Sequence, residues 1–174
     1  EFTAAAIDLA RATGKDDAKA NLSFLLSSGT QSRVVDPAQL AKNLAPAVVS
    51  SVQSVPGQNR EQASAEAAAL FGVFSKAATD TKGESTATAL IQYANELQKF
   101  FQGKENDPGT LFGRISKLQN DQGLKDSFFE KDFGEQRFRG IFKAVTDKQS
   151  QWVKELTNSR AKISTDTGVF DRNA

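Results

Sequence analysis

The chain has 174 residues, of which 39% are hydrophobic and 25% are charged, a balance typical of a globular domain rather than a disordered segment. Its 22 basic and 21 acidic residues leave a net charge of +1, which gives no electrostatic reason to expect nucleic acid as a partner. The chain has no cysteine and no histidine, which excludes thiol nucleophiles, disulfides, Cys/His zinc sites and histidine general bases.

The ends of the sequence suggest a fragment of a longer protein. There is no methionine, and no apolar run approaches the roughly 18 residues that a membrane-spanning helix needs. No secretion-signal pattern opens the chain. We expect residues 1–3 to lie outside the fold as a cloning scar or disordered start, residues 4–163 to form one helical domain, and residues 164–174 to form a flexible tail.

The first 30 residues predict two short helices. Residues 4–12 form the first, whose larger apolar side chains are Ile7 and Leu9. Asp16 or Asp17 can start the second, because a carboxylate at a helix N-terminus accepts hydrogen bonds from free amide groups. The apolar positions of this second helix are Ala18, Leu22, Leu25 and Leu26.

Asp36 and Pro37 start a third helix. The aspartate can cap it, and proline suits the first turn, where its missing N–H would have no helical partner. Pro46 lies inside this helix, where it removes a hydrogen bond and clashes with the preceding turn. We therefore expect the helix to be kinked or split near Leu44.

Residues 61–101 predict two amphipathic helices around which the fold is organised. Gly83 can adopt the left-handed backbone that ends the first, and Ser85 can cap the second. The short loop makes them antiparallel neighbours. Their apolar residues recur at steps of three and four, giving one apolar face each. These are Ala63, Ala67, Leu70, Phe71, Phe74, Ala77 and Ala78, and then Ala87, Leu90, Ile91, Ala94, Leu97, Phe100 and Phe101.

The remaining third predicts further helices. Asp107 and Pro108 repeat the cap-then-proline start, NDQG at 120–123 has the composition of a turn, and a short helix ends by Gly134. The longest helix runs from about Glu135 to Ile163, and its polar middle allows its second half to project from the body. The predicted fold class is all-α, a compact bundle of six to eight helices with a central antiparallel helical hairpin and a long C-terminal helix.

Thirteen phenylalanines against one tryptophan and one tyrosine form either a core or an adhesive surface. Core is the favoured interpretation, because most of them lie on helical stripes. Phe128 and Phe129 are the exception, since adjacent helical residues point about 100° apart and one of the two is then exposed. Together with Trp152 they are the predicted partner contacts.

No catalytic, metal-binding or cofactor-binding residue is predicted. Acidic clusters at 105–107 and 130–135 alternate with lysines, which is typical of solvated faces and caps rather than a catalytic pair. NDQG and KENDPG lack the ligand spacing of calcium loops. The basic tilt of the last helix is partly cancelled by Glu135, Asp147 and Glu155, so no specific nucleic-acid site is expected.

From about Asp36 onward, the order of features resembles the conserved region of bacteriophage and prophage tail tape-measure proteins. The features are the small-residue helix EAAALFGVFSKAA, a short loop with Ser/Thr and Glu, the helix TALIQYANELQKFF, and the series LFGRISKLQNDQGLKDSFFEKDFGEQRFRGIFKAV. The resemblance rests on helical pattern and spacing and contains no catalytic signature.

This resemblance implies a non-enzymatic structural protein of the phage tail. Such a protein is assembled in the bacterial cytoplasm, lies inside the tail tube of the virion and sets tail length. Tube subunits, tail-tip proteins and assembly chaperones are the implied partners, and self-association is a further candidate.

Two other classes stay open. One is a helical protein–protein interaction module, an effector or adaptor, that uses Phe129 and Trp152 as anchors in a partner. The other is an enzyme, which would need a concave site with a strongly shifted Glu, Asp or Lys. The residues favour the enzyme least.

Overall fold

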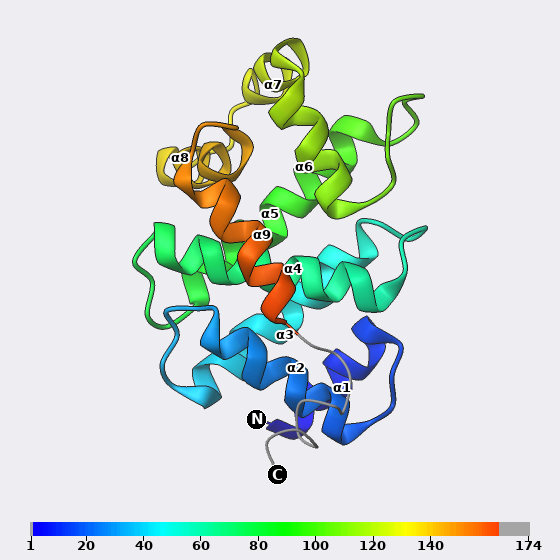
Figure 1. Cartoon of the computed structure of the whole chain (residues 1–174), viewed down its shortest axis with the longest axis vertical. Helices are drawn as coiled ribbons and strands as arrows, with labels where there is room; N and C mark the ends of the chain where they lie inside the picture. Colours follow the sequence, from blue (N-terminus) through cyan, green and yellow to red (C-terminus); the bar gives the residue numbers. More distant parts are fainter. Residues whose placement is uncertain (1, 164–174) are drawn as a thin grey trace.

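The structure is a computed structural model that describes residues 2–163 (Figure 1), with the side chains described from residue 4 onward. Within that range the chain forms nine α-helices and no strand, which confirms the all-α class and exceeds the predicted six to eight. Their bounds are α1 Phe2–Thr13, α2 Ala18–Thr30, α3 Pro37–Gln53, α4 Arg60–Ala77, α5 Glu84–Phe101, α6 Leu111–Asn120, α7 Gln122–Phe129, α8 Gln136–Thr146 and α9 Gln151–Lys162.

Helix α4 is the central element of the molecule. It lies near the middle, with α1–α3 on one side and α6–α8 on the other (Figure 1), and it contacts α1, α2, α3, α5, α6, α8 and α9. Every residue from Ala63 to Ser75 is buried. The predicted single apolar face is therefore wrong for this helix, which is buried on all sides, as is typical of a helix without a polar face.

Small residues allow neighbouring backbones to approach α4 closely. At Gly72, an added Cβ would lie 2.3 Å from the carbonyl oxygen of Gln31, just past the end of α2. Glycine in a helix interior costs about 1 kcal/mol relative to alanine. Here that cost is offset by a helix crossing that no larger residue permits.

The turn between α4 and α5 differs from the prediction in its capping. Thr79 adopts a left-handed conformation (φ 53°), and the amide of Asp80 donates to the carbonyl of Ser75 at 2.8 Å. Gly83 (φ 95°) is the N-cap of α5, and Ser85 lies inside the helix rather than capping it. The two predicted helices contact each other, and α3 packs against both.

Helix α3 continues through Pro46, so it is not split near Leu44, and the alternative of a kink there stays a prediction. Proline removes only one hydrogen bond of the helix. Burial of Leu44, Ala47 and Val48 on both sides of it holds the two halves together.

Eight of the phenylalanines and Tyr93 form one continuous cluster of rings in the core, and the phenylalanines are Phe74, Phe100, Phe101, Phe128, Phe129, Phe133, Phe138 and Phe142. Tyr93 contacts Phe74, Phe128 and Phe142 with ring centroids 4.7–6.2 Å apart, and Phe133 contacts Phe142 at 5.2 Å. The Tyr93 hydroxyl lies 2.8 Å from Thr146 Oγ1, whose own hydrogen goes to the carbonyl of Phe142. Burial raises the pKa of Tyr93 well above its usual range.

The predicted long C-terminal helix is wrong, because the chain forms two helices with a break at residues 147–150. Asp147 Oδ1 accepts from the amide of Gln149 at 3.0 Å, and the backbone carbonyl of Asp147 accepts from Ser150 at 2.9 Å. This local turn competes with the helical hydrogen bonds. Helix α9 then packs against α4 and does not project, and its Leu156 is buried.

The start of α6 is held by a buried polar network that the sequence did not indicate. Asp107 and Pro108 do not start this helix; Thr110 caps it. Gln58 accepts from the amide of Leu111 at 2.9 Å, and the buried Glu66 of α4 accepts from the amide of Phe112 at 3.0 Å. The free amides of a helix N-terminus are thereby paired inside the core.

Arg114 completes this network. Its side chain is only 4% exposed, and it makes two hydrogen bonds to the Asp107 carboxylate, at 3.0 and 3.1 Å, and one to the carbonyl of Ser54 at 2.8 Å. The Arg114 hydrogen bonds, against the opposing effect of burial, hold the pKa of Asp107 below its usual value. Farther along, Asp121 both ends α6 and caps α7, so the predicted NDQG turn shrinks to one residue.

Candidate functional site

A groove of about 570 Å³ lies between the α4–α5 turn and the helices α8 and α9. It contains Trp152, the only tryptophan of the chain and one of the predicted partner contacts. The residues that line it are Ala77, Ala78, Thr79, Asp80, Ser85, Arg137, Gly140, Ile141, Ala144 and Trp152. The groove therefore joins segments that are far apart in sequence.

Two contacts fix Trp152 at the groove. Ser150 Oγ caps α9 by accepting from the Trp152 amide at 3.2 Å, which places the tryptophan in the first turn of the helix. Lys76 near the end of α4 forms an ion pair with Glu155 at 2.7 Å, one turn farther along α9. The Trp152 side chain is half-buried against the core, so part of the ring stays accessible.

The walls of the groove are made of small side chains. Alanine or glycine occupies four of the lining positions, Ala77, Ala78, Gly140 and Ala144. At Gly140 an added Cβ would meet no atom within 4 Å, so that position faces open space. Thr79 contributes a β-branched residue in a left-handed conformation, which is strained and which occurs preferentially at functional sites.

The polar groups at the rim differ in how strongly they are engaged. Asp80 accepts from the amides of Lys82, Gly83 and Thr86 and from the Thr86 hydroxyl, at 2.8–3.0 Å. Partial burial raises the pKa of Asp80, but these hydrogen bonds outweigh it and the pKa lies below its usual value. Asp80 is thus a fixed anion that caps α5.

Arg137, at the rim of the groove, is held by an exposed ion pair. It pairs with Glu135 at 2.6 Å, and their side chains are 62% and 54% exposed. Exposed ion pairs of this kind contribute about 0–1 kcal/mol, so Arg137 can exchange its partner at little cost. The arrangement suits an apolar side chain that packs beside Trp152 and a carboxylate that binds Arg137.

Phe128 and Phe129 do not line this groove, although a small part of Phe129 lines two other surface pockets, beside Glu130 and Arg139. Phe128 is fully buried and Phe129 is 6% exposed, so the predicted exposure of one of them is wrong. Phe129 contacts the Phe128 and Phe133 rings, and Arg139 and Lys143 lie over it at 5.4 and 5.6 Å. Both phenylalanines therefore pack within the aromatic core, and their role as partner contacts stays a prediction.

The large apolar residues that are exposed lie elsewhere in the described chain. Leu22 and Leu26 of α2 are 43% and 52% exposed, and Ile7 of α1 and Val35 are 53% and 84% exposed. On the same α2, Ser23 and Ser28 are buried and their hydroxyls have no hydrogen-bond partner. The spacing of apolar residues in α2 does not predict that Leu25 is buried while Leu22 and Leu26 are exposed.

Sequence reasoning missed most of the groove because no motif marks it. Arg137, Gly140 and Ile141 are ordinary positions of an amphipathic helix, and Thr79 gains its meaning from its backbone angle. Among residues 2–163 no group of acidic side chains is arranged to hold a metal ion. No helix in the same range is long and apolar enough to cross a membrane.

Comparison with protein-family models, with curated proteins and with solved structures found no match for this chain.

Proposed function

We propose that this chain is a non-enzymatic helical interaction domain that binds a segment of a partner protein in the groove at Trp152. The observation that carries the proposal is the half-buried Trp152, set in a groove with small-residue walls and flanked by the strained Thr79. Tryptophan and arginine are the residues most enriched among those that dominate protein–protein binding energy. The groove contains both.

The occupant that fits is an amphipathic helical segment with a large apolar residue and a carboxylate about one turn away. The apolar side chain would fill the space over Gly140 and Ala144, and the carboxylate would replace Glu135 on Arg137. In this arrangement the central antiparallel hairpin of α4 and α5 is the rigid support, because its turn forms one wall.

The tail tape-measure protein is the setting we propose for this domain. Its support is the order of sequence features from Asp36 onward, among them the small-residue helix that becomes α4. The partner segment would then belong to a tube subunit, a tail-tip protein or an assembly chaperone, with assembly in the bacterial cytoplasm and residence in the virion tail. Antibodies against this domain that label purified tails, and a change of tail length on in-frame lengthening of the parent gene, are the expected results.

The groove itself can be tested directly, because Trp152 is the only tryptophan and its fluorescence reports on this site alone. The probes are synthetic amphipathic peptides of about 15 residues, with a central leucine or phenylalanine and a glutamate one turn away. We expect binding to shift Trp152 emission to shorter wavelength. Peptides with lysine in place of the glutamate should bind at least about tenfold more weakly, because they repel Arg137.

Two variants separate binding from folding. Gly140→Leu places a leucine side chain in the groove, at a position where an added Cβ meets no atom within 4 Å, and should abolish peptide binding. Arg137→Glu should reverse the preference for acidic peptides. Thr88→Leu is the matched control, since it adds a leucine at an exposed position of α5 outside the groove. Equal binding by wild type and Gly140→Leu, or no emission change with any peptide, would refute the proposal.

A further inference from the structure

Helix α2 exposes two leucine side chains, a residue type that helices of globular proteins normally bury. Its leucines at positions 22 and 26 are one turn apart, so they form an apolar stripe on one face, and both are about half exposed. Two polar residues of the same helix are buried instead: the hydroxyls of Ser23 and Ser28 lie in the interior without a hydrogen-bond partner. Burial of an unpaired hydroxyl costs free energy. Phe24 and Leu25 of the same helix are buried in the core and hold α2 in this orientation, which leaves the two leucines exposed.

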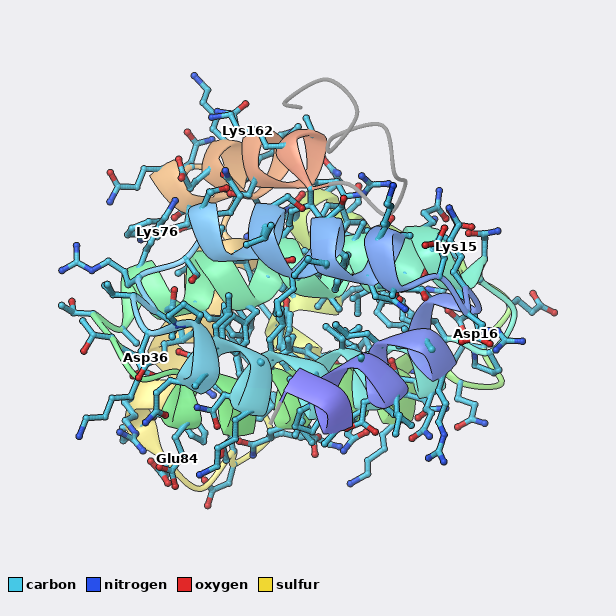
Figure 2. All side chains as sticks on the ribbon, turned by 90° about the horizontal axis from the view of Figure 1, so that it is seen from below. Lys15, Asp16, Asp36, Lys76, Glu84 and Lys162 are labelled. Carbon is cyan, nitrogen blue, oxygen red and sulfur yellow. The ribbon has the colours of Figure 1, made fainter. Side chains whose placement is uncertain are left out.

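Charges lie at both ends of this stripe. Asp16 precedes the helix and is exposed, whereas Arg33 follows its C-terminal end and is also exposed. Figure 2 shows Asp16 beyond one end of α2 and Asp36, which lies just after Arg33 in sequence, beyond the other. The backbone amide of Arg33 donates a hydrogen bond to Ser75 Oγ. The guanidinium group takes no part in this hydrogen bond.

The last turn of α2 also lacks a compensating cation. It contains no basic residue, although the carbonyl groups at a helix C-terminus carry partial negative charge. Lys19 is exposed in the first turn, adjacent to the leucine stripe. A second α2 that runs in the opposite direction would place its Lys19 near these carbonyl groups.

From this we infer that α2 is a self-association surface, on which a second copy of this chain packs its own α2 in antiparallel orientation. Leu22 of one copy lies opposite Leu26 of the other, so the stripe is covered by its own equivalent. Asp16 of each copy then lies near Arg33 of the other, and the two-fold symmetry repeats the pair at both ends. A parallel arrangement would set Asp16 against Asp16 and Arg33 against Arg33.

The surface is small, so the association is weak. The 13 residues of α2 span about 20 Å, and a contact between two such helices buries less than the roughly 1,200 Å² typical of stable interfaces. We expect a dissociation constant on the order of 100 µM, and a high local concentration in an assembly would increase the fraction of dimer. The inference is independent of the Trp152 groove, which lies on other elements.

Sedimentation velocity of the full chain between about 5 µM and about 1 mM tests the association. We expect monomer at the low end and dimer at the high end. Leu22→Gln with Leu26→Gln should keep the far-ultraviolet circular dichroism of the wild type and remain monomeric throughout. Leu25→Ala is not an equivalent control, since Leu25 is buried. Thr157→Gln on α9, another exposed position, is the matched one.

Charge reversal tests the orientation. Asp16→Arg alone and Arg33→Asp alone should each weaken the dimer about tenfold, because like charges then face each other, and the double variant should restore wild-type affinity. A monomer at every concentration, or a dimer that the leucine variant leaves intact, would overturn the surface. A double variant no better than the singles would overturn the antiparallel orientation.

Discussion

Helices α4 and α2 both lack a clean division into an apolar and a polar face, for opposite reasons. In α4 every residue from Ala63 to Ser75 is buried, because neighbouring helices cover it on all sides. In α2 the leucines at 22 and 26 are exposed and serines are buried. The same weak pattern thus marks the most covered helix and a helix with an uncovered apolar stripe, and only the neighbours distinguish them.

The largest expected contrast is in core truncation. Phe74→Ala in α4 removes a fully buried ring that contacts Tyr93 and Phe142, and it should lower the free energy of unfolding by about 4 kcal/mol. Leu26→Ala in α2 should change it by less than about 0.5 kcal/mol, measured in the dilute monomer. Urea unfolding followed by circular dichroism checks both. Similar losses from the two substitutions would mean that α2 is as covered as α4.

Gly72 and Gly140 allow the same substitution to be compared at a position packed against another backbone and at a position that faces open space. Gly72→Ala forces a methyl group onto the Gln31 carbonyl and should destabilise the fold by about 2–3 kcal/mol. Gly140→Ala has the same chemistry in α8 but meets open space, so it should stabilise by about 0.5–1 kcal/mol through helix propensity. Thermal and urea unfolding of the two variants in parallel give the comparison. A stable Gly72→Ala would contradict the close approach of α2 to α4.

The network at α6 predicts a pH dependence. Asp107→Asn leaves Arg114 buried without its carboxylate and should cost about 2 kcal/mol at neutral pH. Because the pKa of Asp107 is below its ordinary value of 3.8 in the folded protein, its contribution is complete above that value and is lost as pH falls below it. Urea unfolding at several pH values should therefore show the difference between wild type and variant narrowing below about pH 4. Asp16→Asn, at an exposed position, is the control variant and is unfolded at the same pH values.

The smallest effect concerns the buried serines of α2. Ser28→Ala removes a hydroxyl that is buried without a partner, so it should be neutral or stabilise by up to about 1 kcal/mol. Ser27→Ala, at a half-buried position next to it, serves as the comparison. Calorimetric unfolding can resolve a change of this size. A clear loss of stability at Ser28 would show that its hydroxyl is satisfied and that α2 sits where its polar groups need it.

Local signals predicted much of the secondary structure. Asp36 with Pro37 and the apolar residues of α5 place two helices correctly, since capping and periodicity act within a few residues. The break at Asp147 and Ser150 has a local signal too, a turn-forming aspartate followed by a capping serine, whereas the sequence prediction treats this stretch as the polar middle of one helix. At Asp107 the local signal predicts a helix start that the structure does not have. Its carboxylate binds Arg114 instead of capping α6.

Burial and the candidate site were harder to predict because they depend on tertiary neighbours. Phe128 and Phe129 are both covered by a third aromatic residue, Phe133, from the segment that follows α7. Trp152 could be singled out as the only tryptophan, but its groove is formed by residues from four other segments. The exposure of Leu22 and Leu26 follows from the way α2 packs on α4, which periodicity does not encode.

Hydrogen exchange of the full chain, followed by mass spectrometry at low and high protein concentration, tests the contrast between α4 and α2 most directly. We predict that α4 exchanges only through global unfolding at both concentrations, because it is covered on all sides by its own chain. Helix α2 should exchange faster at low concentration and gain protection at high concentration, as a second copy covers its leucines. Exchange of α2 that is as slow as that of α4 and independent of concentration would contradict this account.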